Sequence, residues 1–332
     1  MQEGRSYVAV VGKNRRKVLF GSKKRFAEIM PHDNGQSLRN TLSPIWFNPY
    51  PWIVLIRPHH WVKNIFVFAG LLFTQGWHDT TLGVQVTDAF MAFCLMSSFV
   101  YVINDMVDLT ADITHPGKCY RPLAKGTISL RSAGVVAVLC LIGSVVLATI
   151  AGQKVLIIVS AYAVLNMFYS FWLKHVVILD VFVIAMGFML RLAAGTLGVG
   201  IDPSKWLIIC SLMLTLFLGF AKRRAELSIR SDHSRRLLAH YTLPMLDKMI
   251  SIVASATIVT YALYTVDAET VQFHGTDHLV YTVPVVMYAM FRYLYLLHYH
   301  GQGEDPATDL FRDRHILGSL LIWGALVIGI LR

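Results

Sequence analysis

The sequence predicts an all-α, polytopic membrane protein in which nine transmembrane helices surround a polar cavity that faces the cytoplasm. Of its 332 residues, 55% are apolar and only 15% are charged, whereas a soluble domain carries roughly a quarter charged residues. The mean hydropathy is +0.54. The apolar residues fall into blocks of about 20, the length that crosses a hydrocarbon core of about 30 Å. This pattern excludes a disordered chain, a coiled coil and a disulfide-stapled secreted module.

Residues 1–45 differ from the rest of the chain because they form a basic tail. They carry nine Lys and Arg against three acidic residues, which is +6 of the formal net charge of +10. No apolar stretch of signal-peptide length follows, so no cleaved signal is predicted. We interpret the tail as lying on anionic lipid headgroups, where each basic residue contributes about 1 kcal/mol, rather than on nucleic acid. Residues 46–332 then form the nine-helix membrane domain.

Nine apolar segments follow in that domain. They cover residues 61–75, 86–104, 132–150, 154–172, 177–200, 205–221, 249–266, 279–298 and 315–331. The first and last are short, so we expect them to extend into their flanks. Four tryptophans near span ends are typical of the aromatic belts at membrane surfaces: Trp61, Trp77, Trp172 and Trp206.

The charges of the loops predict the orientation. The loops after the second, fourth, sixth and eighth segments hold fourteen basic residues, and the alternate loops hold two. Basic loops stay in the cytoplasm. We therefore expect a multi-pass protein of the cell (inner) membrane with a cytoplasmic N-terminus and active site, and with the C-terminus outside.

The second segment ends in an aspartate motif, N-D-M-V-D-L-T-A-D at residues 104–112. On a continued helix, Asp105, Asp108 and Asp112 share one face. Clustered carboxylates repel one another unless a cation lies between them, and Mg²⁺ accepts one or two carboxylates together with water and substrate phosphate oxygens. A solvated acidic helix end is the alternative. We favour Mg²⁺ because the motif lies at the membrane surface and basic residues follow it.

Those basic residues belong to a loop, H-P-G-K-C-Y-R-P-L-A-K-G at residues 115–126. Its prolines and glycines exclude a regular helix. Lys118, Arg121 and Lys125 would face the metal across a bound pyrophosphate, with the cation on one side and charged donors on the other.

The aspartate motif and the K-x-x-R-P-L-A-x-G loop, on nine predicted spans, resemble the UbiA superfamily of membrane prenyltransferases. Within it they resemble the decaprenyl-phosphate 5-phosphoribosyltransferase branch. Further similar stretches lie at residues 57–64, 169–174, 187–191, 222–227 and 312–314. The resemblance covers about residues 50–332 and leaves out the basic tail.

The loop after the sixth span distinguishes between branches. Members that act on aromatic acceptors carry a second aspartate cluster there. In this sequence, residues 221–232 hold only Glu226 and Asp232 as acids, among four basic residues. This composition favours two phosphorylated substrates over a neutral aromatic acceptor. One departure is Arg224, which stands where the branch pattern K-R-Y-A-E-L has an aromatic residue.

The resemblance implies a Mg²⁺-dependent transfer of a 5-phosphoribosyl group from phosphoribosyl pyrophosphate to a polyprenyl phosphate, which supplies a lipid-linked arabinose donor for cell-wall glycans. Asp105 and Asp108 would hold the metal, supported by Asn104 or Asp112. The residues expected to bind the substrates are Lys63, Lys118, Arg121, Tyr169, Lys174, Arg191, Lys222, Arg223 and Glu226.

Several of these residues have a structural alternative. Arg191 lies about eleven residues into the fifth span, where an unpaired guanidinium costs at least about 2.5–3.5 kcal/mol. It either contacts a phosphate through a polar cavity or pairs with a neighbouring helix. Lys63 and Lys174 either bind phosphate or extend their side chains to the membrane surface. We interpret the glycines 195, 198 and 200 as permitting close helix packing.

Two other functions remain open. One is transfer of a prenyl group from a prenyl diphosphate to an aromatic or haem acceptor, and the other is a transporter or a non-catalytic membrane protein. The expected partners are both phosphorylated substrates and membrane lipids, with no nucleic acid. A homo-oligomer is left open.

Overall fold

The computed structural model describes residues 49–331, apart from 74–78, 116, 230–239 and 300–312. Within the described residues the chain is helical and contains no strand, which confirms the all-α class. The basic tail, Trp77, Asp232 and Arg312 lie outside the described residues, so the predicted division of the chain at residue 45 stays a prediction.

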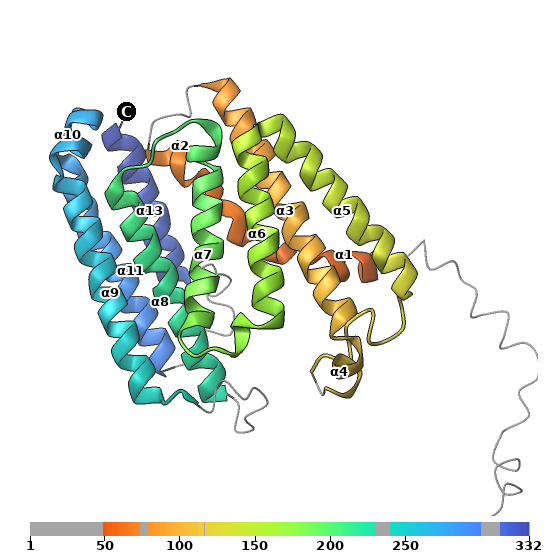
Figure 1. Ribbon diagram of the computed structural model, residues 1–332. Coiled ribbons are helices and arrows are strands. Elements are labelled where there is room, and N and C mark those ends of the chain that lie inside the picture. Colours follow the sequence, from red (N-terminus) through yellow and green to blue (C-terminus); the bar gives the residue numbers. More distant parts are fainter. Residues whose placement is uncertain (1–48, 74–78, 116, 230–239, 300–312, 332) are drawn as a thin grey trace, which may run out of the picture. The chain divides into compact units, whose positions relative to one another are not determined.

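Eight helices of the described chain are long and apolar enough to cross a membrane. They are α3 (Thr80–Val107), α5 (Leu130–Ala151), α6 (Gln153–Phe171), α7 (Leu179–Ala194), α8 (Lys205–Ile229), α9 (Leu243–Val266), α11 (Val283–Tyr299) and α13 (Arg314–Leu331). Figure 1 shows them side by side in one bundle. Side-chain oxygens of Asp79, Ser129 and Thr242 cap the first turns of α3, α5 and α9, which stabilises each helix start.

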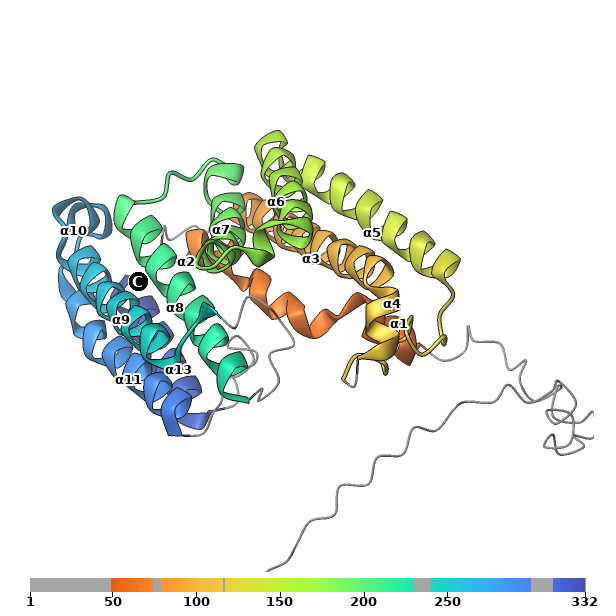
Figure 2. The ribbon, with the colours of Figure 1, turned by 60° about the horizontal axis from the view of Figure 1, so that its bottom comes forward.

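The segment predicted as the first span is a broken helix, so the count of nine spans is not confirmed. It consists of α1 (Tyr50–Ile56), a 3₁₀ helix η3 (Pro58–Phe68) and α2 (Ala69–Phe73). The break falls at Arg57, whose φ of 53° is left-handed, and Pro58 follows it. In Figure 2 the segment runs from α2 near α8 to α1 near α4 (Leu109–Thr114). It packs against both α3 and α7 on the way.

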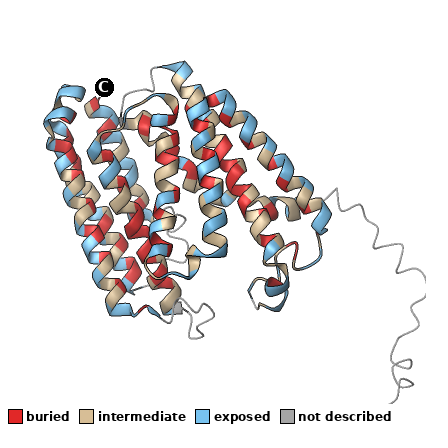
Figure 3. Cartoon of the chain, viewed as in Figure 1, coloured by how far each residue is buried: buried red, intermediate tan, exposed pale blue. Residues whose placement is uncertain are grey.

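Two large groups of buried apolar side chains hold the bundle together. One joins α7, α8, α9, α11 and α13, and the other joins η3, α3, α5, α6 and α7. Helix α7 contributes to both groups and therefore connects the two halves. Figure 3 shows exposed positions along the outward faces of the long helices. Many of the exposed residues are large and apolar, as expected for a surface in contact with lipid.

Close packing at the glycines confirms part of the sequence interpretation. A Cβ built on Gly195 would lie 1.7 Å from the Val67 carbonyl oxygen, and one on Gly198 would lie 2.9 Å from Val155 Cγ2. Gly200 has open space around it, so it does not permit close helix packing. Its φ of +86° is a left-handed conformation that glycine adopts without strain, and this allows the turn there.

We expect Gly195→Ala to destabilise the protein by about 1–3 kcal/mol, because the added methyl group forces η3 away from α7. The melting temperature of the detergent-purified variant measures the effect. Gly329→Ala in α13 is the matched control, since nothing lies within 4 Å of a Cβ there. Equal melting temperatures of the two variants would contradict the contact between Gly195 and Val67.

Candidate active site

The aspartate motif lies where α3 gives way to α4. Helix α3 ends at Val107, and Asp108 (φ −84°, ψ 5°) forms the junction with the six-residue α4. Backbone hydrogen bonds still continue across this junction, from Asp108 N to Asn104 O and from Asp112 N to Asp108 O, both 2.9 Å. The chain therefore keeps Asp105 and Asp112 on the same side despite the break.

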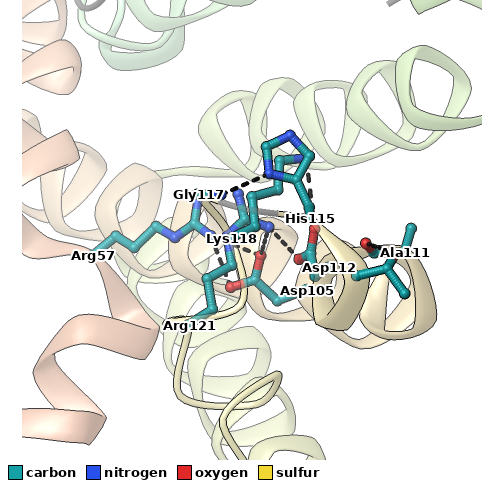
Figure 4. A network of polar contacts seen from close by, with 9 residues as sticks. Arg57, Asp105, Ala111, Asp112, His115, Gly117, Lys118 and Arg121 are labelled. Carbon is teal, nitrogen blue, oxygen red and sulfur yellow. Dashed lines mark hydrogen bonds and ion pairs between the residues drawn. The ribbon is translucent and has the colours of Figure 1, made fainter. Parts of the chain in front are cut away.

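Asp105 and Asp112 are buried and meet the basic loop in one network (Figure 4). Arg57 Nη2 donates to both oxygens of Asp105, at 2.7 and 2.8 Å. Arg121 Nη1 lies 2.9 Å from Asp105 Oδ1 and 2.5 Å from Asp112 Oδ2. Lys118 Nζ is 3.6 Å from Asp112 Oδ1. Lys118 and Arg121 therefore lie next to the aspartates and pair with them directly, while their predicted contact with a pyrophosphate stays a prediction.

Arg57 is a member of this cluster that the sequence analysis did not assign. Its left-handed backbone conformation is uncommon for a residue other than glycine. The conformation is held by a hydrogen bond from Arg57 N to Ile53 O, by the ion pair with Asp105 and by the Tyr101 ring 5.1 Å away. The only sequence signal was its position before Pro58 in a stretch that resembles the family.

The remaining residues of the motif are arranged differently. Asp108 is partly exposed, and its side chain makes no capping hydrogen bond to α4. Asn104 Oδ1 accepts a hydrogen bond of 2.9 Å from Ser170 Oγ at the end of α6. In the part of the chain that the structure describes, no three acidic, His or Cys side chains come together as a ready metal site. Metal binding by all three aspartates therefore stays a prediction.

A second cluster surrounds Arg223 at the end of α8. Arg223 is 2% exposed, and its Nε lies 2.6 Å from Asp180 Oδ2 on α7. Its Nη1 contacts Glu226 Oε2 at 2.5 Å, and its Nη2 contacts the Tyr169 hydroxyl at 3.2 Å. The predicted residues Tyr169, Arg223 and Glu226 therefore lie together, with Asp180 as an unassigned fourth member.

Tyr241 completes this second cluster from the loop before α9. Its hydroxyl donates to Asp180 Oδ1 at 2.9 Å and accepts from the backbone N–H of Ile178 at 2.6 Å. Burial raises the pKa of Tyr241 to about 12, and the nearby Asp180 carboxylate adds to this increase. The hydroxyl thus stays protonated at neutral pH. Ile178 has a φ of 69°, a rare conformation for a β-branched residue, and Tyr241 holds it in place.

The last turn of α6 joins the two clusters. Tyr169 contacts Arg223, and the next residue, Ser170, contacts Asn104. The acidic cluster at the end of α3 and the Arg223 cluster at the end of α8 therefore lie on either side of one helix end.

Arg191 has the structural partners that the sequence analysis gave as its alternative role. Its Nε donates to Asn64 Oδ1 at 2.6 Å, its Nη1 to Gly187 O at 2.6 Å and its Nη2 to the Tyr162 hydroxyl at 3.0 Å. The rings of Tyr162 and Phe188 lie within 5.3 Å of the guanidinium carbon. These contacts fasten η3 to α6 and α7, and a contact of Arg191 with phosphate stays a prediction.

Three lysines of the predicted site are half-buried: Lys63 in η3, Lys174 in η5 (Leu173–His175) and Lys222 in α8. Arg224, which departs from the branch pattern, has a structural use. Its Nε lies 2.5 Å from Asp247 Oδ1 on α9, and its Nη1 lies 3.0 Å from Leu297 O on α11. Arg224 thus ties three helices together.

A bundle of apolar helices with a buried carboxylate–guanidinium cluster at one end defines a polytopic membrane protein with a charged site where its helices end. The chain belongs to the UbiA prenyltransferase family, whose sequence profile matches residues 64–313. This confirms the resemblance inferred from the motifs.

Relatives and solved structures support the assignment. The decaprenyl-phosphate phosphoribosyltransferase of Mycolicibacterium smegmatis is 30% identical over an alignment of 289 residues, and the alignment covers 82% of this chain and 89% of that one. The enzyme of the same name from Corynebacterium glutamicum is 31% identical and covers 82% and 83%. The structure of a UbiA homolog from Archaeoglobus fulgidus bound to GPP and Mg²⁺ has a TM-score of 0.64. It is 16% identical and covers 85% of this chain and 99% of that one, a likeness of fold alone.

Proposed function

We propose that this protein transfers a 5-phosphoribosyl group from phosphoribosyl pyrophosphate to a polyprenyl phosphate of the decaprenyl type and releases pyrophosphate. The observation that carries the proposal is the pair of clusters joined by Tyr169 and Ser170, one rich in carboxylates and one centred on Arg223. Such a pair suits one substrate with a pyrophosphate and a second with its own phosphate. The names of the relatives support the same substrate class.

The first cluster fits a divalent cation. One nitrogen of Arg121 lies within 2.9 Å of oxygens of both Asp105 and Asp112, so two carboxylates already converge on one positive charge. Mg²⁺ takes one or two carboxylates of this kind. In our proposal Asp105 and Asp112 hold Mg²⁺, with Asp108 as a third candidate ligand. The bound ion would neutralise charge on the pyrophosphate.

The side chains around this cluster then act on the substrates. Arg121 and Lys118 stabilise negative charge on the leaving oxygen while the bond from C1 of ribose to pyrophosphate breaks. The electron pair of that bond leaves with pyrophosphate, and an oxygen of the lipid phosphate forms the new bond to C1. Since that phosphate is already an anion near neutral pH, no general base is needed.

The second cluster orients the other groups. In our proposal Glu226 binds a ribose hydroxyl, and Arg223 fixes Glu226 through its contact of 2.5 Å. Lys63, Lys174 and Lys222 are the candidates to bind the 5-phosphate and the lipid phosphate, and Arg191 holds the neighbouring helices in place. Both clusters lie at the ends of predicted cytoplasmic loops, so we place the site and the N-terminus in the cytoplasm and the C-terminus outside.

The proposal is tested with detergent-purified protein, labelled phosphoribosyl pyrophosphate, decaprenyl phosphate and Mg²⁺. We expect a labelled lipid product that no longer forms when EDTA is added. A parallel reaction offers a prenyl diphosphate and an aromatic acceptor. If product forms only in this parallel reaction, the family assignment still holds, but our interpretation of the second cluster is wrong.

A further inference from the structure

A groove lies between α11 and the first turns of α13, away from the aspartate cluster. Its volume is about 430 Å³, and it is lined by Pro284, Val285, Tyr288, Arg314, His315, Gly318, Ser319 and Ile322. Apolar atoms make up most of its wall, and the one charged side chain among these lining residues, Arg314, is at the first residue of α13. Neither the proposed reaction nor the two clusters described above uses this groove.

The polar end of the groove is positively charged. Asp313 caps α13 by accepting hydrogen bonds from the backbone N–H groups of His315 and Ile316, both 3.0 Å. It also pairs with Arg292 at 2.8 Å, and the hydrogen bond from Arg292 lowers the pKa of Asp313 to about 2. The Asp313 charge is therefore neutralised by Arg292.

Arg314 is exposed beside this neutralised pair. Within the described residues no carboxylate lies at ion-pair distance from its guanidinium. Next to it, the Tyr288 hydroxyl and His315 Nδ1 are 3.1 Å apart, so both rings are fixed at the rim. The N-terminal end of α13 adds its own partial positive charge. An anionic group is thus the chemical complement of this end.

The rest of the groove lies along a membrane-spanning surface. Arg314 is the first residue of the α13 span, which places it near the level of the lipid headgroups. Pro284, Tyr288 and Ile322 are exposed on the outward face. Below Arg314, Gly318 leaves open space, since nothing lies within 4 Å of a Cβ built on it. A ligand that fits has an anionic head and an apolar tail.

We propose that this groove binds one anionic phospholipid, with its phosphate at Arg314 and an acyl chain along Gly318 and Ile322 between α11 and α13. The site is separate from the proposed reaction and does not depend on it. Single Lys or Arg residues near an anionic membrane surface contribute about 1 kcal/mol each. Loss of Arg314 should therefore weaken binding about fivefold, which is that energy expressed as a ratio of affinities.

The experiment measures binding of phosphatidylglycerol and phosphatidylcholine to full-length, detergent-purified protein by native mass spectrometry. Lipid-dependent melting temperature is the second readout. We expect the unaltered protein to prefer phosphatidylglycerol. Arg314→Gln should lower this preference about fivefold, and Gly318→Leu should lower it by filling the groove without changing the charge. Soluble glycerol phosphate should not bind measurably, since it lacks the acyl chain.

The matched control is Arg131→Gln, which removes a basic residue from the first turn of α5. It should leave the lipid preference unchanged. An equal loss of lipid preference in this control would show a general effect of charge and overturn the proposed lipid site. The proposal would also be overturned if Arg314→Gln and Gly318→Leu both kept the full preference for phosphatidylglycerol. It would be overturned as well if the unaltered protein formed a dimer that Gly318→Leu dissociates at the same detergent concentration. Variants are compared only where their melting temperatures without lipid match that of the unaltered protein.

Discussion

Asp105→Asn is expected to lower the turnover of phosphoribosyl pyrophosphate by on the order of 10²–10³-fold, the loss typical when one group that stabilises transition-state charge is removed. The Asp105 carboxylate is 4% exposed and contacts both Arg57 and Arg121. Asparagine keeps the shape of the side chain but removes its charge, so it can neither balance the two guanidinium groups nor bind a divalent cation as strongly. The measurement is the rate of labelled lipid formation at saturating substrate.

Two further variants separate loss of chemistry from loss of folding. Asp112→Asn keeps the ion pair between Arg57 and Asp105 and should lower the rate in the same direction. Asp202→Asn, at an exposed position before α8, should change nothing. Full activity of Asp105→Asn would remove this carboxylate from the mechanism. A drop in melting temperature large enough to unfold it at the assay temperature would make Asp112→Asn the deciding variant.

Much of the fold followed from local sequence patterns. Apolar blocks of span length and the positions of charged loops predicted eight helices that the structure contains, because a helix in lipid depends mainly on length and composition. The first span could not be predicted in this way. Its sequence carries the polar residues Lys63 and Asn64 and follows Pro58. In the structure it is a 3₁₀ helix that packs against α3 and α7, contacts that local composition does not encode.

The candidate site was predictable where its residues are close in sequence. The spacing of Asp105 and Asp112 and the nearby Arg121 indicated one cluster, and the structure contains it. Partners far along the chain were not predictable. Arg57 is 48 residues from Asp105, and Asn64 is 127 residues from Arg191. Which elements become neighbours is set by tertiary packing, which a motif does not encode.

Asp180 illustrates the same point. Asp180 and Arg191 lie about three turns apart on nearly the same face of α7, so the sequence alone would make them candidates for a pair. In the structure Asp180 instead pairs with Arg223 on α8 and accepts a hydrogen bond from Tyr241. Arg191 has no need of it, because uncharged oxygen atoms and aromatic rings surround its guanidinium.

The Arg223 cluster leads to the second large effect, on stability. Arg223→Met is expected to destabilise the protein by about 3–5 kcal/mol, the cost of leaving a buried ion without its partner. Asp180 is fully buried, and Glu226 is 14% exposed. Both carboxylates would lose the guanidinium that balances them. Unfolding of the detergent-purified variant by heat or denaturant measures the loss.

The neighbouring residue supplies the matched control. Arg224→Met removes the same charge from the next position of α8, but its partner Asp247 is 34% exposed and can be solvated. Its cost should be smaller than that of Arg223→Met, because water can solvate the remaining Asp247 carboxylate and the other lost contact is a single hydrogen bond to Leu297 O. Adding Asp180→Asn to Arg223→Met should recover part of the lost stability, because the buried charge is then removed from both sides. If the double variant is as unstable as the sum of the two single variants, Arg223 acts through packing and not through its charge.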